Sequence, residues 1–270
     1  MYPPEFNYVR PATMEGAVKA LSRDGAMALA GGQSLVPLLK LRLAYPTLLV
    51  DINRLPLRYV KYGGEVQIGA LTRHYELEDS PCGLLSQTAR RIGDVQVRSV
   101  GTVGGSLAHG DPRGDWPVAM LAAGAVVKAV GPSGGREIEA EKLYVGPYST
   151  TLARGELITE VRLRCPERGA YVKFSPRRND FALAAVAVAA WVKGGHIDEI
   201  KIAAAGAAEM PVRLRKVEAF LQGAPLNREI ITEAAEIAKR EAAPPYDFRA
   251  SVEYRRALVA TALRRALEKI

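Results

Sequence analysis

Two glycine-rich stretches, Ala30-Gly31-Gly32-Gln33-Ser34 and Gly101-Thr102-Val103-Gly104-Gly105-Ser106, stand far apart in this chain of 270 residues. Each contains two adjacent glycines beside a small hydroxyl residue. Adjacent glycines can take positive φ and bring main-chain N–H groups close to an anion. Successive N–H groups form a concave nest for phosphate oxygens. The pair therefore predicts a site for the two phosphates of a dinucleotide, and two purely structural turns are the alternative that glycines alone leave open.

The residues around the first stretch predict a small β-α-β unit. Thr13 can cap a helix over 13–23, and residues 26–30 suit a strand that enters the glycine turn. A helix over 35–43 and a buried strand over 48–52 follow. The glycine turn is thus expected at a strand-to-helix junction.

The rest of the chain predicts a mixed fold. A hairpin is expected over 57–69, and residues 93–112 are expected to be an irregular, functional loop because they are glycine-rich and long. After a boundary at 165–169, strands near 170–175, 183–192 and 197–205 and three helices predict an α+β domain. The expected helices lie near 213–222, 227–241 and 251–268.

Composition narrows the classes of function. The net charge is +8, but the arginines are scattered and no basic tract interleaves with aromatic residues, which argues against nucleic-acid binding. The longest apolar run, 182–192, is too short to cross a bilayer. The N-terminus resembles no secretory signal, so a cytoplasmic location is expected.

The chain has too few cysteines and histidines, at unsuitable spacings, to form a metal centre from them. Cys82 and Cys165 cannot supply an iron–sulfur cluster or a thiolate zinc site, and the three histidines show no ligand spacing. Any redox chemistry is therefore expected from an organic cofactor or a partner chain.

The common nucleotide-binding motifs G-x-G-x-x-G and the P-loop are absent. The second glycine stretch is instead followed by His109, Asp111 and Asp115. Carboxylates can accept hydrogen bonds from ribityl or ribose hydroxyls. A phosphate nest beside such acceptors fits a nucleotide better than a bare anion.

These motifs, in this order, resemble one family. Ala30 to Pro37, the 102–106 stretch with Asp111 and Asp115, and Lys173-x-x-x-Arg177-Arg178-x-Asp180 are similar to the FAD-binding medium subunit of molybdenum hydroxylases. Carbon monoxide dehydrogenase, xanthine dehydrogenase and archaeal aldehyde or glyceraldehyde oxidoreductase represent this family. The resemblance covers the whole chain and outweighs the structural-turn alternative.

The resemblance implies an α+β fold. A vanillyl-alcohol-oxidase-type FAD-binding domain would span residues 1–165, with lobes 1–53 and 54–165. A small α+β domain with a three-stranded antiparallel sheet would span 166–270. FAD would lie extended between the lobes, and its pyrophosphate would contact residues 30–34 and 102–106.

The resemblance also implies individual contacts. Asp115 would bind a cofactor hydroxyl, Ile92 and Ile158 would pack on its rings, and Lys173 would approach the polar edge of the isoalloxazine, where a cation stabilises the reduced flavin. Phe181 replaces a tyrosine of several relatives and leaves the tuning of that flavin face open. The expected cofactor-binding residues are Ala30, Gly31, Gly32, Gln33, Ser34, Leu35, Ile92, Thr102, Val103, Gly104, Gly105, Ser106, His109, Asp111, Asp115, Ile158 and Lys173. No catalytic side chain and no metal ligand are expected.

The implied function is electron transfer within a larger enzyme. A large molybdopterin subunit would hydroxylate the substrate, and electrons would pass through [2Fe–2S] clusters of a small subunit to FAD here and on to an external acceptor. A dimer of heterotrimers is expected. A scaffold subunit with a degenerate flavin domain and a stand-alone flavin reductase of the same superfamily are the alternatives.

Overall fold

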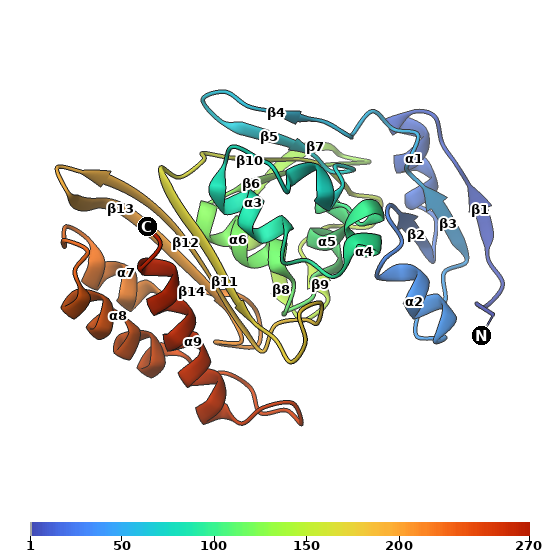
Figure 1. Cartoon of the computed structure of the whole chain (residues 1–270). Helices are drawn as coiled ribbons and strands as arrows, with labels where there is room; N and C mark the ends of the chain where they lie inside the picture. The colour runs from blue at the N-terminus through green and yellow to red at the C-terminus, as the bar shows by residue number, and fades with distance from the viewer. Residues whose placement is uncertain (1) are drawn as a thin grey trace.

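The N-terminal part of the chain is a small α/β layer (Figure 1). The computed structural model describes residues 2–270. Three strands form a parallel sheet in the order β1-β3-β2, and the predicted β-α-β unit is confirmed. Thr13 caps the first helix by accepting a hydrogen bond from the Gly16 N–H at 3.1 Å. The bounds are β1 (Asn7–Val9), α1 (Met14–Leu21), β2 (Ala26–Leu29), α2 (Leu35–Lys40) and β3 (Leu48–Asp51).

The middle part contains a five-stranded sheet in the order β4-β5-β10-β6-β7, in which every pairing is antiparallel. Its strands are β4 (Val60–Lys61), β5 (Val66–Gly69), β6 (Val126–Gly131), β7 (Gly134–Glu139) and β10 (Leu157–Leu163). Its helices are η1 (His74–Leu77), α3 (Gly83–Ala89), α4 (Val95–Val100), α5 (Val103–His109), α6 (Asp115–Ala123) and η2 (Ala140–Lys142). A separate small hairpin joins β8 (Tyr144–Gly146) to β9 (Ser149–Thr150).

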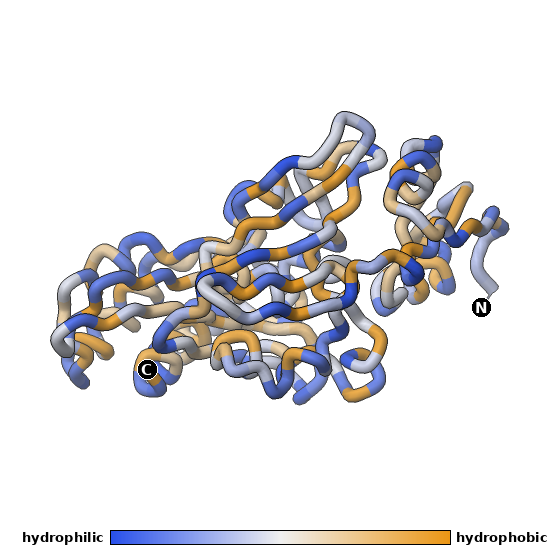
Figure 2. The backbone as a smooth tube through the Cα atoms, turned by 90° about the horizontal axis from the view of Figure 1, so that it is seen from above, coloured by the Kyte–Doolittle hydropathy of each residue, from blue (hydrophilic) through white to orange (hydrophobic). Residues whose placement is uncertain are grey.

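The C-terminal part is an antiparallel sheet in the order β11-β12-β13-β14, covered on one face by three helices (Figure 1). The expected three strands are present, and a two-residue strand adds a fourth at the edge. In the tube view the N- and C-terminal parts lie at opposite ends of the molecule (Figure 2). The bounds are β11 (Arg168–Phe174), β12 (Ala184–Lys193), β13 (His196–Ala205), β14 (Val212–Arg213), α7 (Arg215–Leu221), α8 (Arg228–Glu241) and α9 (Val252–Leu267).

Strand β12 is buried on both faces. Ala185, Ala187 and Ala189 belong to the core that includes α6, whereas Val186 and Val188 belong to the core beneath α9. Successive side chains of a strand point to opposite faces, so this sheet connects the middle part of the chain to the C-terminal helices.

One feature differs from the expectations, and another was not predicted. The stretch 93–112, expected to be irregular, contains α4 and α5. In addition, Cys82 and Cys165 form a disulfide that joins the start of α3 to the residues before β11. Among residues 2–270, no helix is long and apolar enough to cross a membrane.

Candidate cofactor-binding site

The first glycine turn lies at the strand-to-helix junction between β2 and α2, as expected. Gly32 has φ +69°, the left-handed conformation that favours glycine. Within residues 2–270, no protein acceptor takes a hydrogen bond from the N–H groups of Gly32, Gln33 or Ser34. A row of free N–H groups at a helix N-terminus is suited to an anion. This turn therefore fits the phosphate of a nucleotide.

The second stretch has a different conformation. Thr102 caps α5, and its Oγ1 accepts from the Gly105 N–H at 3.1 Å. Gly104 and Gly105 have no positive φ, so the expectation of a second left-handed nest is wrong. The N–H groups of Val103, Gly104 and Ser106 donate to Thr72, Ala70 and Thr102 carbonyls.

The second glycine pair is required because its neighbours leave no room for a Cβ. A Cβ added at Gly104 would lie 2.5 Å from the Cβ of Ala70, and one added at Gly105 would lie 2.6 Å from the Thr102 hydroxyl. Gly104 thus lets α5 pack closely on the residue that follows β5, and Gly105 leaves room for the Thr102 cap. The half-buried Ser106 hydroxyl makes no hydrogen bond within the described chain, so it is free to meet a ligand.

The structure brings the two glycine stretches into contact. A Cβ added at Gly31 would lie 2.2 Å from the carbonyl oxygen of Val100 and 2.9 Å from the Cα of Gly101. A Cβ added at Gly105 would lie 3.7 Å from that of Ala30. The stretches that the sequence separates therefore pack against each other.

Asp115 and Lys173 form a buried ion pair. The Lys173 Nζ lies 3.0 Å from Asp115 Oδ1 and donates to the Arg91 carbonyl at 3.0 Å. Tyr171 donates its phenol O–H to Asp115 Oδ1 at 2.5 Å. Burial raises the pKa of Asp115, while Lys173 and the Tyr171 hydrogen bond act against that rise. The two expected site residues are thus brought together, and Tyr171 joins them.

His109 and Asp111 lie where α5 ends. Gly110 between them has φ +64° and ends the helix. Asp111 accepts from the Arg113 N–H at 2.8 Å and from the Tyr148 phenol at 3.5 Å. The His109 ring lies 5.2 Å from the Tyr148 ring, and burial lowers the pKa of His109.

The expected flavin-contacting isoleucines lie at the middle core. Ile158 is buried within this core, and Ile92 is half-buried against it. Both isoleucines therefore have a packing role in the protein itself. Phe181 is 50% exposed and lies in the loop between β11 and β12.

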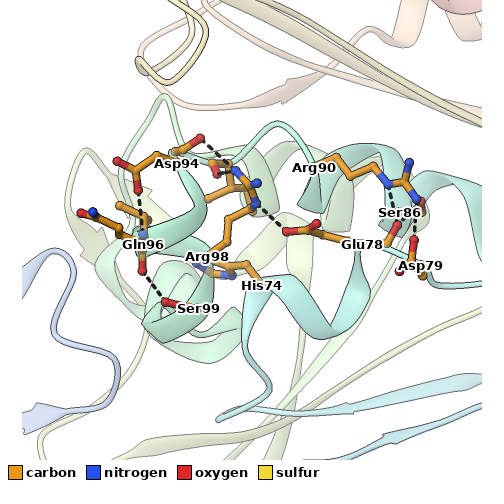
Figure 3. Close-up of polar contacts among 12 residues, drawn as sticks. His74, Glu78, Asp79, Ser86, Arg90, Asp94, Gln96, Arg98 and Ser99 are labelled. Atoms are coloured by element: carbon orange, nitrogen blue, oxygen red, sulfur yellow. Dashed lines mark hydrogen bonds and ion pairs between the residues drawn. The ribbon is translucent and has the colours of Figure 1, made fainter.

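His74 is a buried residue beside the second glycine stretch that the sequence did not reveal (Figure 3). It accepts a hydrogen bond at Nδ1 from the Trp116 indole N–H at 2.9 Å, and its main-chain N–H donates to Gly101 at 3.1 Å. Burial lowers the pKa of His74 to about 3, so the ring is neutral. His74 thereby joins the residue before Thr102 to the residue after Asp115. A single buried histidine carries no sequence signal for such a role, and neither does Tyr171.

A salt bridge holds the segment of His74 against α4. Arg98 donates through Nε to Glu78 Oε1 at 2.5 Å, and its Nη1 donates to the carbonyls of Ile92 and Gly93 (Figure 3). The Asp94 carboxylate caps α4 by accepting from the Val97 N–H at 2.8 Å. These contacts fix the position of α4, which leads directly into the second glycine stretch.

Known families cover nearly all of the chain. Residues 4–165 match the FAD binding domain in molybdopterin dehydrogenase, and residues 169–270 match the CO dehydrogenase flavoprotein C-terminal domain.

Individual relatives agree with this assignment. The chain is 39% identical to the glyceraldehyde dehydrogenase medium chain of Sulfolobus acidocaldarius, with 100% of both chains covered. It is 35% identical to the carbon monoxide dehydrogenase medium chain of Afipia carboxidovorans, covering 100% of this chain and 98% of the relative. A chain of the carbon monoxide dehydrogenase of Hydrogenophaga pseudoflava matches the structure with a TM-score of 0.94 at 37% identity, covering 100% and 98% of the two chains. The chain therefore belongs to the FAD-binding medium subunits of the molybdenum hydroxylases, an electron-transfer family of oxidoreductases.

Proposed function

We propose that this subunit holds FAD with its diphosphate against the two glycine stretches and its flavin end toward Asp115 and Lys173. The free N–H groups of Gly32, Gln33 and Ser34, beside the backbone of Val100 and Gly101, carry this proposal. Main-chain donors aimed at one point bind an anion without any lysine. The Ser106 hydroxyl supplies a further donor from the second stretch.

The remaining expected residues have defined tasks in this proposal. Asp115 accepts from a cofactor hydroxyl with the carboxylate held in place by Tyr171 and Lys173. His109 and Asp111 line the same cleft, and Lys173 contributes positive charge near the flavin. Bound FAD supplies the capacity to take up single electrons and to release one or two. No side chain of this chain acts as an acid, base or nucleophile.

Membership of the family supports the proposed assembly. A small subunit with [2Fe–2S] clusters and a large molybdopterin subunit would join this chain in a dimer of heterotrimers. The FAD domain would comprise residues 1–165, with lobes 1–53 and 54–165, and the C-terminal domain would comprise 166–270. Oxidation of an aldehyde or carbon monoxide on the large subunit is supported by the relatives named glyceraldehyde and carbon monoxide dehydrogenase. A cytoplasmic location is part of the same proposal.

A matched pair of glycine substitutions tests the site. Gly31→Ala places a methyl group 2.2 Å from the Val100 oxygen, whereas Gly64→Ala meets no atom within 4 Å. We expect Gly31→Ala to purify without flavin absorbance and Gly64→Ala to stay yellow. Equal flavin content in both variants, with both folded, would contradict the proposed site. A colourless wild-type chain that also fails to take up added FAD would favour the scaffold alternative.

Purification of the native protein tests the assembly. We expect molybdenum and iron–sulfur chains to co-purify with this subunit. A yellow chain that purifies alone and oxidises a reduced nicotinamide would favour the stand-alone reductase.

A further inference from the structure

Two side chains outside the glycine stretches connect one stretch to the other. Asn53 follows β3 in the N-terminal layer, and Arg73 precedes η1 in the middle part. Neither residue belongs to the proposed cofactor-contacting set. Their side chains nevertheless meet, because an Arg73 Nη2 hydrogen donates to Asn53 Oδ1 at 2.8 Å.

Asn53 binds the first residue of the first glycine stretch. Its side-chain Nδ2 donates to the Ala30 carbonyl at 2.9 Å and to Asp51 Oδ1 at 2.7 Å. Asp51 also accepts from the Asn53 main-chain N–H at 2.9 Å and from the Tyr8 phenol at 2.5 Å. These contacts orient the Asn53 amide, so its oxygen is directed at Arg73.

Arg73 binds residues at the start of the second glycine stretch and just before it. Its Nη1 donates to the Val100 carbonyl, which is also the atom that Gly31 packs against. The backbone of Arg73 forms an antiparallel bridge with Thr102, the cap of α5. The Arg73 N–H donates to Glu76 Oε2 at 2.7 Å, which anchors the residue to η1.

We infer that the Asn53–Arg73 pair is a positioning device that sets the distance between the two glycine stretches and thereby selects a flavin dinucleotide over a flavin mononucleotide. This inference rests on the proposed function. A guanidinium is a planar fork whose donors have fixed directions. One guanidinium that donates to both Val100 and Asn53 therefore keeps the two glycine stretches at a fixed distance from each other. That separation matters for a diphosphate that contacts both stretches and much less for a single phosphate.

The test compares FAD with FMN on the full-length chain freed of flavin. Dissociation constants are measured by quenching of flavin fluorescence for Asn53→Ala, Arg73→Gln and Arg73→Lys. Arg73→Lys keeps the charge and the aliphatic stem but lacks the planar fork whose two nitrogens reach the two acceptors, so it covers the case in which Arg73→Gln does not fold. Arg58→Gln is the matched control, since Arg58 binds the same Glu76 at 3.0 Å without touching either stretch.

We expect each Asn53 or Arg73 variant to bind FAD at least tenfold more weakly while its FMN affinity changes less than twofold. The double variant Asn53→Ala/Arg73→Gln should be no worse than Arg73→Gln, because both changes break one connection. Arg58→Gln should leave both affinities unchanged. An equal loss for FAD and FMN would overturn the inference, because it would indicate direct phosphate contact or general damage. Unchanged FAD affinity in the folded variants would also overturn it.

Gly31→Ala separates failure of this inference from failure of the proposed site. If Gly31→Ala loses FAD while Asn53→Ala and Arg73→Lys retain it, the site stands and the positioning role is wrong. If all of these variants retain FAD, the proposed site is wrong and the positioning role is overturned with it.

Discussion

Lys173 and Asp115 face each other at 3.0 Å, and their side chains are only 1% and 5% exposed. They come from β11 and the first turn of α6, so the pair joins the C-terminal sheet to the middle part of the chain. Removing one partner of a buried pair leaves an uncompensated charge.

Lys173→Met should therefore lower the free energy of unfolding by about 3–5 kcal/mol, the usual cost of breaking a buried pair. Denaturant unfolding of the flavin-free chain measures this loss of unfolding free energy. The double variant Lys173→Met/Asp115→Asn should recover part of the loss, because no buried charge remains. Lys239→Met, at an exposed position of α8, is the control. A loss no larger than in that control would contradict the prediction.

Tyr171→Phe removes the hydroxyl that donates to Asp115 and keeps the ring. We expect a loss of about 1.5–3 kcal/mol of unfolding free energy, typical of a hydrogen bond to a charged group. Tyr254→Phe, at an exposed residue of α9, should change stability very little. Equal stability of the two variants would show that the Tyr171–Asp115 hydrogen bond does not contribute to the unfolding free energy.

The disulfide should stabilise the chain mainly by restricting its unfolded state. Cys82 and Cys165 are separated by 83 residues. A chain-entropy treatment of a loop of this size gives about 4–5 kcal/mol. Unfolding with and without a thiol reductant measures the difference, and a thiol titration under denaturing conditions verifies the bond. In Cys82→Ala/Cys165→Ala the reductant should have no effect on stability.

His74 should make stability depend on pH. Its pKa falls to about 3 in the folded chain from the ordinary value of 6.5, because burial opposes the charged ring. The unfolded chain therefore binds a proton more readily, so stability falls as the pH drops from 6.5 toward 3. The slope from this one group approaches about 1.4 kcal/mol per pH unit within that window.

His74→Gln should remove this slope while an amide oxygen can still accept from Trp116. His196→Gln, at an exposed residue of β13, should keep the wild-type pH dependence. The measurement is the unfolding free energy of each protein between about pH 7 and about pH 4, which spans most of the window between the ordinary and the folded-state pKa of His74. The same slope in the wild type and both variants would exclude His74 as its source.

Local patterns predicted the elements with clear hydrophobic periodicity. The β2-α2-β3 unit and the apolar strand β12 were predicted because their side-chain patterns are regular over their length. The helix α5 was missed, since Gly104 and Gly105 disfavour helix, and only the packing of Gly104 against Ala70 and of Gly105 against the Thr102 hydroxyl accounts for them.

The site was predictable only in part. Motif resemblance indicated both glycine stretches, Asp115 and Lys173, and the structure brings each pair together. The bond between Cys82 and Cys165 and the contact between Asn53 and Arg73 join residues that are distant in sequence. Such contacts depend on how the sheets pack, and no local spacing encodes them.

The two-sided burial of β12 bears on how this protein can be dissected. A chain truncated at the end of β10 would uncover the surface that Ala185, Ala187 and Ala189 now seal. The excised C-terminal piece would in turn present those alanines to water. Neither fragment would be a self-sufficient folding unit, so calorimetry of the intact subunit should record one cooperative melting transition instead of two.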